Sequence, residues 1–528
     1  MRRWNGWGDA AVSYPLPDSA AAVLTQRVGP GIPPRDASLA EVLASVPPSR
    51  LPPHPLVSTE PEVRLRHARG QSFPDLIVMR SGRVPAFPDG VAFPRNSEEV
   101  RALFSCARDA GARLIPYGGG TSVVGHVNVA PGDAPVLTVS LEHLQQLHSL
   151  SEEDRLATFG AGVSGPQLED ALRARGYTLG HFPQSFELST LGGWIVTRSR
   201  GQQSLGYGRI ENLFTGGRLE SPAGTMVLPS FPASATGPDL RELVLGSEGR
   251  MGILTEATVR ISPRPEREDF HALFFPDWER ARTAVRELVQ SGTPLSMLRL
   301  STAQETAINL ALSGHPRMVG LLSGALSLWG VGSEGCMLVL GVSGSQRTVE
   351  SAEHTAMGIA GRHGGVRIPL LGQKWLKGRF RAPYLRNAAW ERGWGVDTVE
   401  TATSWSNVPR LLTAVEGALR GALEDQGEQA LVFTHLSHVY PTGSNLYTTF
   451  IFRLGTDAGE THARWLALKT AASRAMIANG GTISHQHGVG TDHRPWLEAE
   501  KGALGLSAIR QLLGTFDPEG LLNPGKLV

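Results

Sequence analysis

Three consecutive glycines, Gly118 to Gly120, end a short apolar segment within residues 113–127, RLIPYGGGTSVVGHV. Glycines have no side chains that would hold a ligand away from the main chain, so successive backbone N–H groups can surround an anion. Thr121 and Ser122 follow directly and add two hydroxyl donors. The segment therefore predicts a strand followed by a phosphate-binding loop, with a nucleotide pyrophosphate as the expected ligand. Because it has neither the lysine of a P-loop nor the order G-x-G-x-x-G, an ordinary tight turn is the alternative.

The segments around this loop predict alternating strands and helices. Residues 90–94 have the pattern of a short strand, and a helix beginning near Asn96 carries two glutamates in its first turn, where negative charge is favourable. Two further segments rich in glycine and hydroxyl groups, residues 180–194 and 244–261, each lie beside a predicted strand. Three loops of this kind indicate one extended ligand.

Composition limits the class of protein. The 528 residues allow two or three domains, and 41% apolar with 19% charged residues is an ordinary globular composition. Fifty basic and 49 acidic residues nearly cancel, so we expect no nucleic-acid partner. Cys106 and Cys336 are too few for a disulfide framework or a thiolate metal cluster. The first residues contain no apolar run of the signal-peptide kind, and we expect a cytoplasmic protein.

The order of these patterns predicts an α+β fold in four segments. Residues 1–84, rich in proline and alanine, form an N-terminal arm with helical segments. Residues 85–265 form one α+β domain, which ends where two prolines interrupt any regular element. Residues 266–480 form a second α+β domain with an antiparallel sheet, and residues 481–528 form a C-terminal segment that contains a helix.

The most apolar run, residues 319–331, is shorter than the ~20 residues that a membrane span needs. It fits an acyl tunnel, a segment that dips into the lipid interface, or a plain buried element. Residues 330–335 match G-x-G-x-x-G, but an apolar strand follows where a helix should begin, so we predict a turn. Residues 371–399 interleave tryptophans with basic residues. In a chain with almost no net charge, this favours a helical surface or a substrate mouth over single-stranded nucleic acid binding.

Two single residues in the second domain are candidates for chemistry. Arg299 lies in an apolar strand pattern, where it is either an edge residue facing water or a ligand clamp. Tyr447 lies in the second arm of a hairpin predicted over residues 430–452, and its phenol projects from a sheet surface. A tyrosine in this position is otherwise a structural residue.

The most distinct cluster of polar residues in the sequence contains two histidines. In GTISHQHGVG, residues 481–490, His485 and His487 point to the same face if the chain is extended, and two imidazoles in one pocket suit proton transfer. A solvated polar loop is the alternative. His435 and His438 invite a metal interpretation, but residues three apart on a strand point to opposite faces, so they should not chelate together.

These motifs together carry a resemblance. PDGVAFP, PYGGGTS, GHFPQSFELSTLGGW and TGPDLRELVLGSEGRMGILTEATVRI resemble the FAD-binding domain of the vanillyl-alcohol oxidase (PCMH) type flavoproteins. Within that superfamily, RRWNGWG, RHARGQSFPDLIVMR, ETATSW and ISHQHGVG resemble the alkyldihydroxyacetonephosphate synthase family, and the resemblance covers nearly the whole chain. It implies an FAD-binding domain over residues 85–265, a cap or substrate domain over residues 266–480, and a tail that returns to the FAD-binding domain.

The resemblance also implies an activity. In that family, oxidised FAD captures the substrate carbon at N5 after proton removal, a fatty acid leaves and a fatty alcohol adds, with no net redox change. This would make the chain an enzyme of ether lipid synthesis that exchanges the acyl chain of acyl-dihydroxyacetonephosphate for a fatty alcohol. Tyr447 is implied as proton acceptor, His485 and His487 as acid/base and positioning groups, and Arg299 as anion clamp. The family has three consecutive histidines where this chain has Gln486 in the middle.

Two other functions stay open at this point. One is an FAD-linked oxidoreductase, a dehydrogenase or oxidase, that acts on a small hydroxy acid. The other is a flavoprotein kept for binding alone. The flavin-dependent hydroxyacid dehydrogenases of the superfamily carry His-x-Gly-Asp-Gly-Asn-x-His, and this chain lacks its central residues, so we expect no metal.

We expect the FAD to be bound without a covalent bond. Superfamily members that attach FAD through the first loop need a histidine where this chain has residues 120–122, and His126 lies too far along to replace it. The expected substrate is a small molecule or lipid, and we also expect peripheral membrane contact and a homodimer. The residues expected at the FAD are Pro116, Gly118, Gly119, Gly120, Thr121, Ser122, His181, Ser185, Ser189, Thr190, Gly193, Trp194, Ser247, Glu248, Gly249, Gly252 and Ile253.

Overall fold

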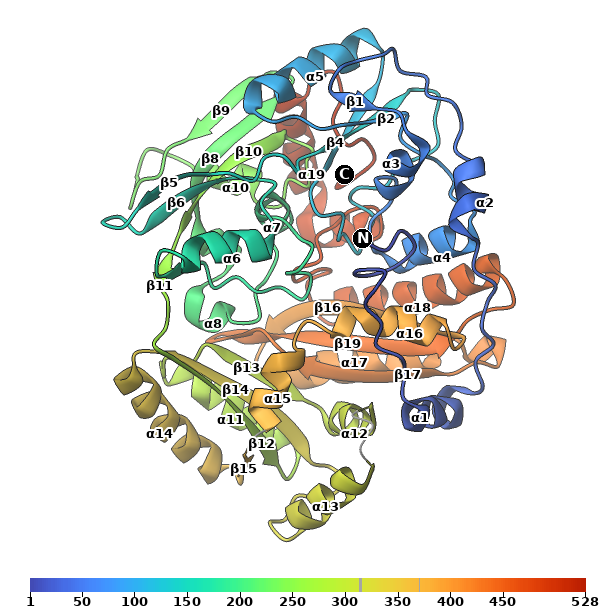
Figure 1. Cartoon of the computed structure of the whole chain (residues 1–528). Helices are drawn as coiled ribbons and strands as arrows, with labels where there is room; N and C mark the ends of the chain where they lie inside the picture. Colours follow the sequence, from blue (N-terminus) through green and yellow to red (C-terminus); the bar gives the residue numbers. More distant parts are fainter. Residues whose placement is uncertain (313–315, 370) are drawn as a thin grey trace.

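The computed structural model describes residues 1–312, 316–369 and 371–528. The chain forms two halves, of which the upper one in Figure 1 contains two main sheets and a two-stranded pair, and the lower one a single large sheet. The N-terminal residues lie between the halves (Figure 1). Helices are combined with mostly antiparallel sheets, so the predicted α+β class is confirmed.

The first sheet carries the glycine-rich loop. Its strands, in spatial order, are β1 (Val57–Ser58), β2 (Gly90–Ala92), β4 (Val136–Ser140) and β3 (Arg113–Tyr117). β2, β4 and β3 run parallel. α5 (Ser97–Asp109) begins where the Asn96 side chain accepts a hydrogen bond from the N–H of Glu99, and its apolar face packs into the core of this sheet. The predicted order of strand, helix, strand and glycine-rich loop is therefore present.

The second sheet is antiparallel. Its strands, in spatial order, are β5 (Leu147–Ser151), β6 (Leu156–Gly160), β10 (Ile253–Arg260), β8 (Phe214–Ser221) and β9 (Gly224–Leu228). The hairpin of β8 and β9 turns at residues 221–224. Beside this sheet lie α6 (Gly165–Arg173), α7 (Leu191–Thr197), α9 (Ile210–Leu213), α10 (Arg241–Val244) and the paired short strands β7 (Tyr177–Thr178) and β11 (Ser262–Pro263). The short helix α8 (Ser204–Tyr207) instead packs against the large sheet, where Leu205 contacts its apolar core.

The third sheet is antiparallel and forms the centre of the lower half. Its strands, in spatial order, are β15 (Val366–Ile368), β12 (Arg267–Phe275), β14 (Cys336–Gly344), β13 (Met297–Ser301), β17 (Ala430–Leu436), β19 (Gly443–Arg453) and β16 (Trp394–Ser404), with β18 (Val439–Tyr440) beside β19. The hairpin predicted over residues 430–452 is confirmed. The largest apolar core joins this sheet to α4 (Phe73–Ser81), α11 (Trp278–Gln290), α14 (Gln346–Arg362), α17 (Val408–Gly421) and α18 (Ala458–Ala478).

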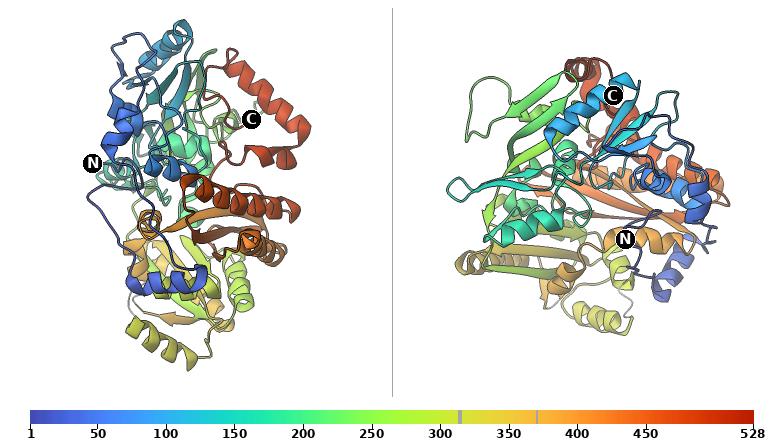
Figure 2. Two further views of the ribbon diagram at one scale, coloured as in Figure 1. Left: turned by 90° about the vertical axis from the view of Figure 1, so that its right-hand side faces the viewer. Right: turned by 45° about the horizontal axis from the view of Figure 1, so that its top comes forward.

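The two ends of the chain pack onto different halves. α1 (Asp18–Val28) packs against the large sheet, whereas the C-terminal residues extend the first sheet, since the N–H of Leu114 donates to Leu521 and that of Asn523 to Leu114. Figure 2 shows α19 (Leu497–Phe516) on the outside of the upper half. The remaining elements are α2 (Leu39–Ala44), α3 (Pro61–Arg66), α12 (Ala303–Leu312), α13 (Pro316–Ser327), α15 (Leu371–Gly378), α16 (Leu385–Trp390), η1 (Ala382–Tyr384), η2 (Glu424–Gln426) and η3 (Arg494–Trp496).

The apolar run of residues 319–331 forms the end of α13 and the turn after it, at the bottom of Figure 1. Leu321 is 77% exposed and Leu328 85% exposed, so the interpretation as a plain buried element is wrong. Residues 330–335 form a turn before β14, as predicted. In the part of the chain that the structure describes, no helix combines the length and apolarity needed to cross a bilayer.

Candidate active site

The glycine-rich loop after β3 packs directly against the loop that precedes α7. A Cβ atom on Gly118 would overlap the hydroxyl of Thr190, and one on Gly119 would overlap the main chain of Leu188. Gly120 has a φ of +59°, a conformation that favours glycine. Gly118 and Gly119 therefore let the two loops touch, and Gly120 lets the chain turn close to the Tyr117 ring.

The main chain of residues 119–123 offers unused donors. Among the hydrogen bonds of the described residues, none is donated by an N–H group of this segment. Buried backbone donors almost always have an acceptor, and a concave run of N–H groups is a typical anion site. An anion such as a pyrophosphate would supply the missing acceptors.

A cavity lies between these loops and the large sheet. Its open space is about 2180 Å³, part of it continuous with solvent. Its wall combines the N-terminal arm, the loops of the upper half, one face of the large sheet and the C-terminal segment. The residues expected at the FAD that lie on this wall are Pro116, Gly118, Gly119, Gly120, Thr121, Ser122, Ser185, Ser189, Thr190, Gly193, Trp194, Glu248, Gly249, Gly252 and Ile253.

The structure places His181 and Ser247 one layer behind this wall. The His181 ring lies 4.8 Å from the ring of Trp194, which is itself a wall residue. Within the described residues, the two ring nitrogens of His181 have no hydrogen-bond partner, and neither does the Ser247 hydroxyl. Burial, with a smaller effect of Arg200, lowers the pKa of His181 to about 3, so its ring is neutral. His181 thus supports Trp194 from behind.

His126 reaches the cavity although sequence reasoning set it aside. Its Nδ1 lies 2.8 Å from the Ser122 hydroxyl, and its Nε2 lies 3.2 Å from a carboxylate oxygen of Glu248. That carboxylate also accepts hydrogen bonds from the N–H groups of Val489 and Gly490. Both ring nitrogens of His126 therefore face protein partners, and we still expect FAD to be held without a covalent bond.

Arg299 on β13 also lies on the wall, and its guanidinium is held from two sides. Its Nη2 is 2.6 Å from Glu305 Oε1 and 3.1 Å from His435 Nδ1, and its Nη1 donates to the Ser301 hydroxyl. Burial alone would raise the pKa of Glu305, but Arg299 and His435 offset this effect and hold it at about 2. Arg299 therefore faces the cavity rather than open water, with a fixed orientation.

Tyr447 on β19 lies opposite His435 on β17, and their rings stack with centroids 4.8 Å apart. Burial, with a smaller effect of Glu400, raises the pKa of Tyr447 to about 12. The phenol is therefore protonated at neutral pH. Tyr447 lies on the cavity wall together with Thr449 of the same strand, as the predicted strand alternation requires.

The histidines of GTISHQHGVG take different places, because this segment is an irregular loop. His487 lies on the cavity wall, with its Nε2 3.6 Å from Glu400 Oε2. His485 lies behind the wall, with its Nδ1 2.8 Å from Glu400 Oε1 and its Nε2 2.7 Å from the Tyr440 hydroxyl. Of the two, His487 is the one that reaches the cavity, and Gln486 lines it as well.

Sequence reasoning missed several polar wall residues. Arg386, at the start of α16, forms an ion pair with Asp397 and lies on the wall. It belongs to residues 371–399, for which a substrate mouth was one interpretation, and that arginine-rich pattern was the available signal. The buried indole N–H of Trp7 also lacks a partner among the described residues. Other wall residues of this kind are Gln71, Asn309, Thr398 and Asn523.

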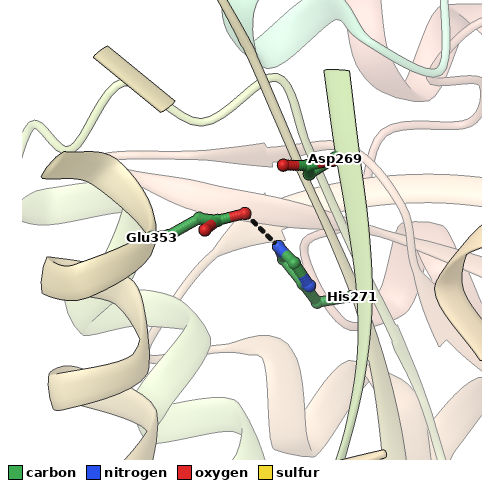
Figure 3. A group of neighbouring side chains, drawn as sticks. All are labelled: Asp269, His271 and Glu353. Carbon is green, nitrogen blue, oxygen red and sulfur yellow. Dashed lines mark hydrogen bonds and ion pairs between the residues drawn. The ribbon is translucent and has the colours of Figure 1, made fainter. Parts of the chain in front are cut away.

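A second cluster of polar side chains lies outside the cavity. Asp269 and His271 on β12 face Glu353 on α14 (Figure 3), with their ligand atoms within 4.8 Å of one another. His271 Nε2 is 2.6 Å from a Glu353 oxygen, while Arg267 Nε is 2.5 Å from Asp269 and Nη2 is 3.8 Å from Glu353. The Arg267 guanidinium thus already supplies positive charge to both carboxylates. We interpret the cluster as an ion-pair network that fixes α14 to the sheet.

Comparisons with known proteins agree with this arrangement. Residues 88–228 match the model of an FAD binding domain, and residues 264–527 match the C-terminal domain of FAD linked oxidases. The chain is 30% identical over 473 residues to the alkyldihydroxyacetonephosphate synthase of Dictyostelium discoideum, which covers 88% of this chain and 77% of that protein. It is also 30% identical over 477 residues to the alkyldihydroxyacetonephosphate synthase of Trypanosoma brucei brucei, with the same coverage.

A solved structure of an alkyldihydroxyacetonephosphate synthase has the same fold. It is 25% identical to this chain, covers 100% of it and 99% of its own length, and superposes with a TM-score of 0.84. The free N–H groups of residues 119–123 and the two touching loops fit the FAD that both family models require. The chain is an FAD-dependent enzyme that belongs to the vanillyl-alcohol oxidase (PCMH) type flavoproteins and, within them, to the family of the alkyldihydroxyacetonephosphate synthases.

Proposed function

We propose that this chain exchanges the acyl chain of acyl-dihydroxyacetonephosphate for a fatty alcohol. In this exchange the bond between C1 and the acyl oxygen breaks, the bond between C1 and the alcohol oxygen forms, and the alcohol proton ends on the released fatty acid. The observation that carries the proposal is a single cavity wall. It joins the unused donors of residues 119–123 to Arg299, Tyr447 and His487.

The loops of the upper half would hold the cofactor. The N–H groups of residues 119–123 and the hydroxyls of Thr121, Ser122 and Thr190 would bind the pyrophosphate of FAD, and the glycines would let it approach the main chain. When bound, FAD supplies an electrophile for the substrate carbon. The remaining steps fall to side chains of the opposite wall.

Arg299 is the cation that we assign to the substrate phosphate. Its guanidinium is held in place by Glu305 and Ser301, and a planar guanidinium can bind a phosphate through two parallel hydrogen bonds. Glu305 also brings a negative charge, which weakens the attraction for an anion. Asn309, one helical turn after Glu305 and also on the wall, is placed to add a neutral donor.

His487 is the group that we assign to proton removal. Burial lowers its pKa to about 4 although Glu400 opposes this effect, so the imidazole is neutral at physiological pH and can accept a proton. The resemblance implies Tyr447 as the acceptor. Because the pKa of Tyr447 is raised to about 12, we assign it instead the role of a hydrogen-bond donor to a substrate oxygen.

Apolar wall residues favour a lipid substrate over a small hydroxy acid. Phe433, Val396 and Leu385 line the cavity beside the polar groups. Each CH₂ group buried against such a surface contributes about 0.8 kcal/mol, so an alkyl chain would gain binding free energy that a small acid cannot. We therefore keep the oxidation of a hydroxy acid as the alternative that experiments must distinguish.

We further propose that the protein is a cytoplasmic homodimer with peripheral membrane contact. The exposed apolar residues of α13 and the turn after it, Leu321, Leu328 and Trp329, support the membrane contact. Co-sedimentation with lipid vesicles would test it, because a variant with all three residues changed to serine should stay in the supernatant. Light scattering on the purified protein would test the dimer.

Product analysis tests the proposed reaction. The purified FAD enzyme is incubated with acyl-dihydroxyacetonephosphate and an isotope-labelled long-chain alcohol, and the lipids are analysed by mass spectrometry. We expect a labelled alkyl product and one free fatty acid for each alkyl group incorporated. Fatty acid release without alkyl product, from an enzyme that carries its FAD, would contradict the proposal.

A further inference from the structure

Glu400 is a fully buried carboxylate on the catalytic face of the large sheet, beside the cavity wall. It lies on β16 directly opposite Tyr447 on β19. Burial would raise its pKa, but the imidazoles of His485 and His487 offset this effect and hold it well below the ordinary value. A buried negative charge is therefore present next to the residue that we assign to proton removal.

The two carboxylate oxygens of Glu400 are used unequally. Oε1 accepts a hydrogen bond from the side-chain amide of Asn445 at 2.6 Å and lies 2.8 Å from His485 Nδ1. Oε2 has no hydrogen-bond partner among the described residues, and the polar atom facing it is His487 Nε2 at 3.6 Å. One oxygen is thus saturated and the other is directed to the histidine of the cavity wall.

His485 has no free nitrogen for chemistry. Its Nδ1–H donates to the Glu400 carboxylate, so in the neutral ring Nε2 accepts the hydrogen bond from the Tyr440 hydroxyl. His487 differs, since its Nδ1 has no hydrogen-bond partner in the described part of the chain and its ring lies on the cavity wall. His485 therefore fixes Glu400, and Glu400 faces His487.

We propose that Glu400 is the positioning residue of His487: its Oε2 keeps the proton of the neutral ring on Nε2, leaves Nδ1 as the base, and stabilises the imidazolium formed when Nδ1 takes the substrate proton. The step that His487 performs rests on the proposed function, whereas its tautomer does not. The separation of 3.6 Å exceeds a normal hydrogen bond, but such contacts commonly shorten when a site is filled. A carboxylate that orients a histidine base in this way is a known device of hydrolytic enzymes.

The variant Glu400→Gln tests whether Glu400 decides which nitrogen of His487 carries the ring proton. The amide keeps the shape of the carboxylate, and its oxygen can still accept from Asn445 and His485. Its NH₂ group then occupies the place of Oε2 and donates to His487 Nε2, which forces the ring proton onto Nδ1. We expect the rate of the first chemical step to fall by about 10²- to 10⁴-fold, as for loss of a general base.

Nitrogen NMR of histidine-labelled enzyme reads this tautomer without any substrate. The His487 signal is assigned by its absence in His487→Asn. We expect an unprotonated Nδ1 in the wild-type FAD enzyme and a protonated Nδ1 in Glu400→Gln. This measurement involves no turnover, so its result does not depend on which reaction the enzyme catalyses. Failure of the proposed function would therefore not be mistaken for failure of the positioning role.

Two further variants separate positioning from mere support of the fold. Glu353→Gln alters a Glu–His pair outside the cavity (Figure 3) and should change neither the His487 signal nor the rate. Glu400→Asp retains the charge, so its rate should be at least tenfold higher than that of Glu400→Gln. The same His487 tautomer in wild type and Glu400→Gln, or an equal rate loss in both Glu400 variants with unchanged spectra, would overturn the proposal.

Discussion

Tyr447 and His487 meet edge to face at the cavity wall, with their ring centroids 6.0 Å apart. They come from a strand and from a loop that is separated from it by α18 in sequence, and both reach the same side of the large sheet. The pKa of Tyr447 is raised to about 12 by burial and that of His487 is lowered to about 4 by burial. At neutral pH the pair therefore consists of a protonated phenol and a neutral imidazole, that is, one donor and one acceptor.

The variant Tyr447→Phe tests the donor role. We expect about a 10²-fold loss of rate, because a hydrogen bond to developing charge is lost while the ring keeps its stacking on His435. Flavin content and thermal stability should stay at the wild-type level, and both can be measured on the purified protein. If the wild-type rate instead rises about tenfold per pH unit towards the pKa of Tyr447, a phenolate is the acceptor and our assignment is reversed.

His487→Ala and His485→Ala should fail in different ways. His487→Ala removes the proton acceptor, so we expect a rate loss of about 10²- to 10⁴-fold with unchanged flavin content. His485→Ala leaves the buried Glu400 and the Tyr440 hydroxyl short of a partner, so we expect a loss of about 3–5 kcal/mol in unfolding free energy. Denaturant titration and steady-state rates on both variants check this contrast. Equal stability losses in the two variants would contradict it.

Gly119→Ala tests the contact between the two loops. The added Cβ would overlap the main chain of Leu188, which cannot move away as a flexible side chain could. We expect purified Gly119→Ala to carry little FAD, measured as the ratio of flavin to protein absorbance. Gly514→Ala in α19 is the matched control, since a Cβ there meets nothing within 4 Å and alanine favours a helix. A full flavin content in Gly119→Ala would show that FAD binding does not require a glycine at this loop contact.

Buried histidines predict a pH dependence of stability. Burial lowers the pKa of His67 and His487 to about 4 and that of His181 and His438 to about 3. Below the unfolded pKa of about 6.5 the unfolded chain binds protons that the folded chain does not, so unfolding free energy falls as the pH falls. The slope is up to about 1.4 kcal/mol per pH unit for each histidine. Asp492, whose pKa burial raises to about 6, takes up a proton in the folded chain over the same range and offsets part of this loss. The four histidines outnumber it, so they dominate between pH 6.5 and 4.5.

Urea titrations of the enzyme at pH 7.5 and 5.5, with the same excess of FAD, measure this loss. In the variant His67→Gln, which lies outside the cavity wall, the loss should be smaller by up to about 1.4 kcal/mol. An unfolding free energy that does not change between the two pH values would show that these rings are not held in the neutral form.

Local sequence signals predicted much of the fold. The glycines before Thr121 marked the end of β3, the alternation around Tyr447 marked the hairpin of β17 and β19, and Asn96 marked the start of α5. Each of these signals acts over a few residues, because caps, turns and strand alternation are local properties of the backbone. The residues expected at the FAD likewise belong to contiguous motifs, and most of them lie on one cavity wall.

The parts that sequence reasoning missed are contacts between distant segments. Glu400 meets His485 across 85 residues of sequence and His487 two residues further on, and Arg386 reaches the wall through its pair with Asp397. Periodicity says which face of an element is apolar but not which buried polar groups will meet. The different places of His485 and His487 had no signal in sequence, since the expected same-face geometry assumed a strand and the segment is a loop.

The most direct test of the proposed exchange measures whether the flavin is oxidised or reduced after turnover. The FAD enzyme is mixed, without oxygen and without any added electron acceptor, with acyl-dihydroxyacetonephosphate and a long-chain alcohol while the visible flavin absorbance and the alkyl product are recorded together. Because the proposed exchange has no net redox change, we predict many alkyl products per enzyme molecule and an oxidised flavin spectrum when the substrate is consumed. Stoichiometric, lasting bleaching of the flavin by a hydroxy acid, with no alkyl product from the lipid substrates, would contradict the account and assign the chain to the oxidoreductases.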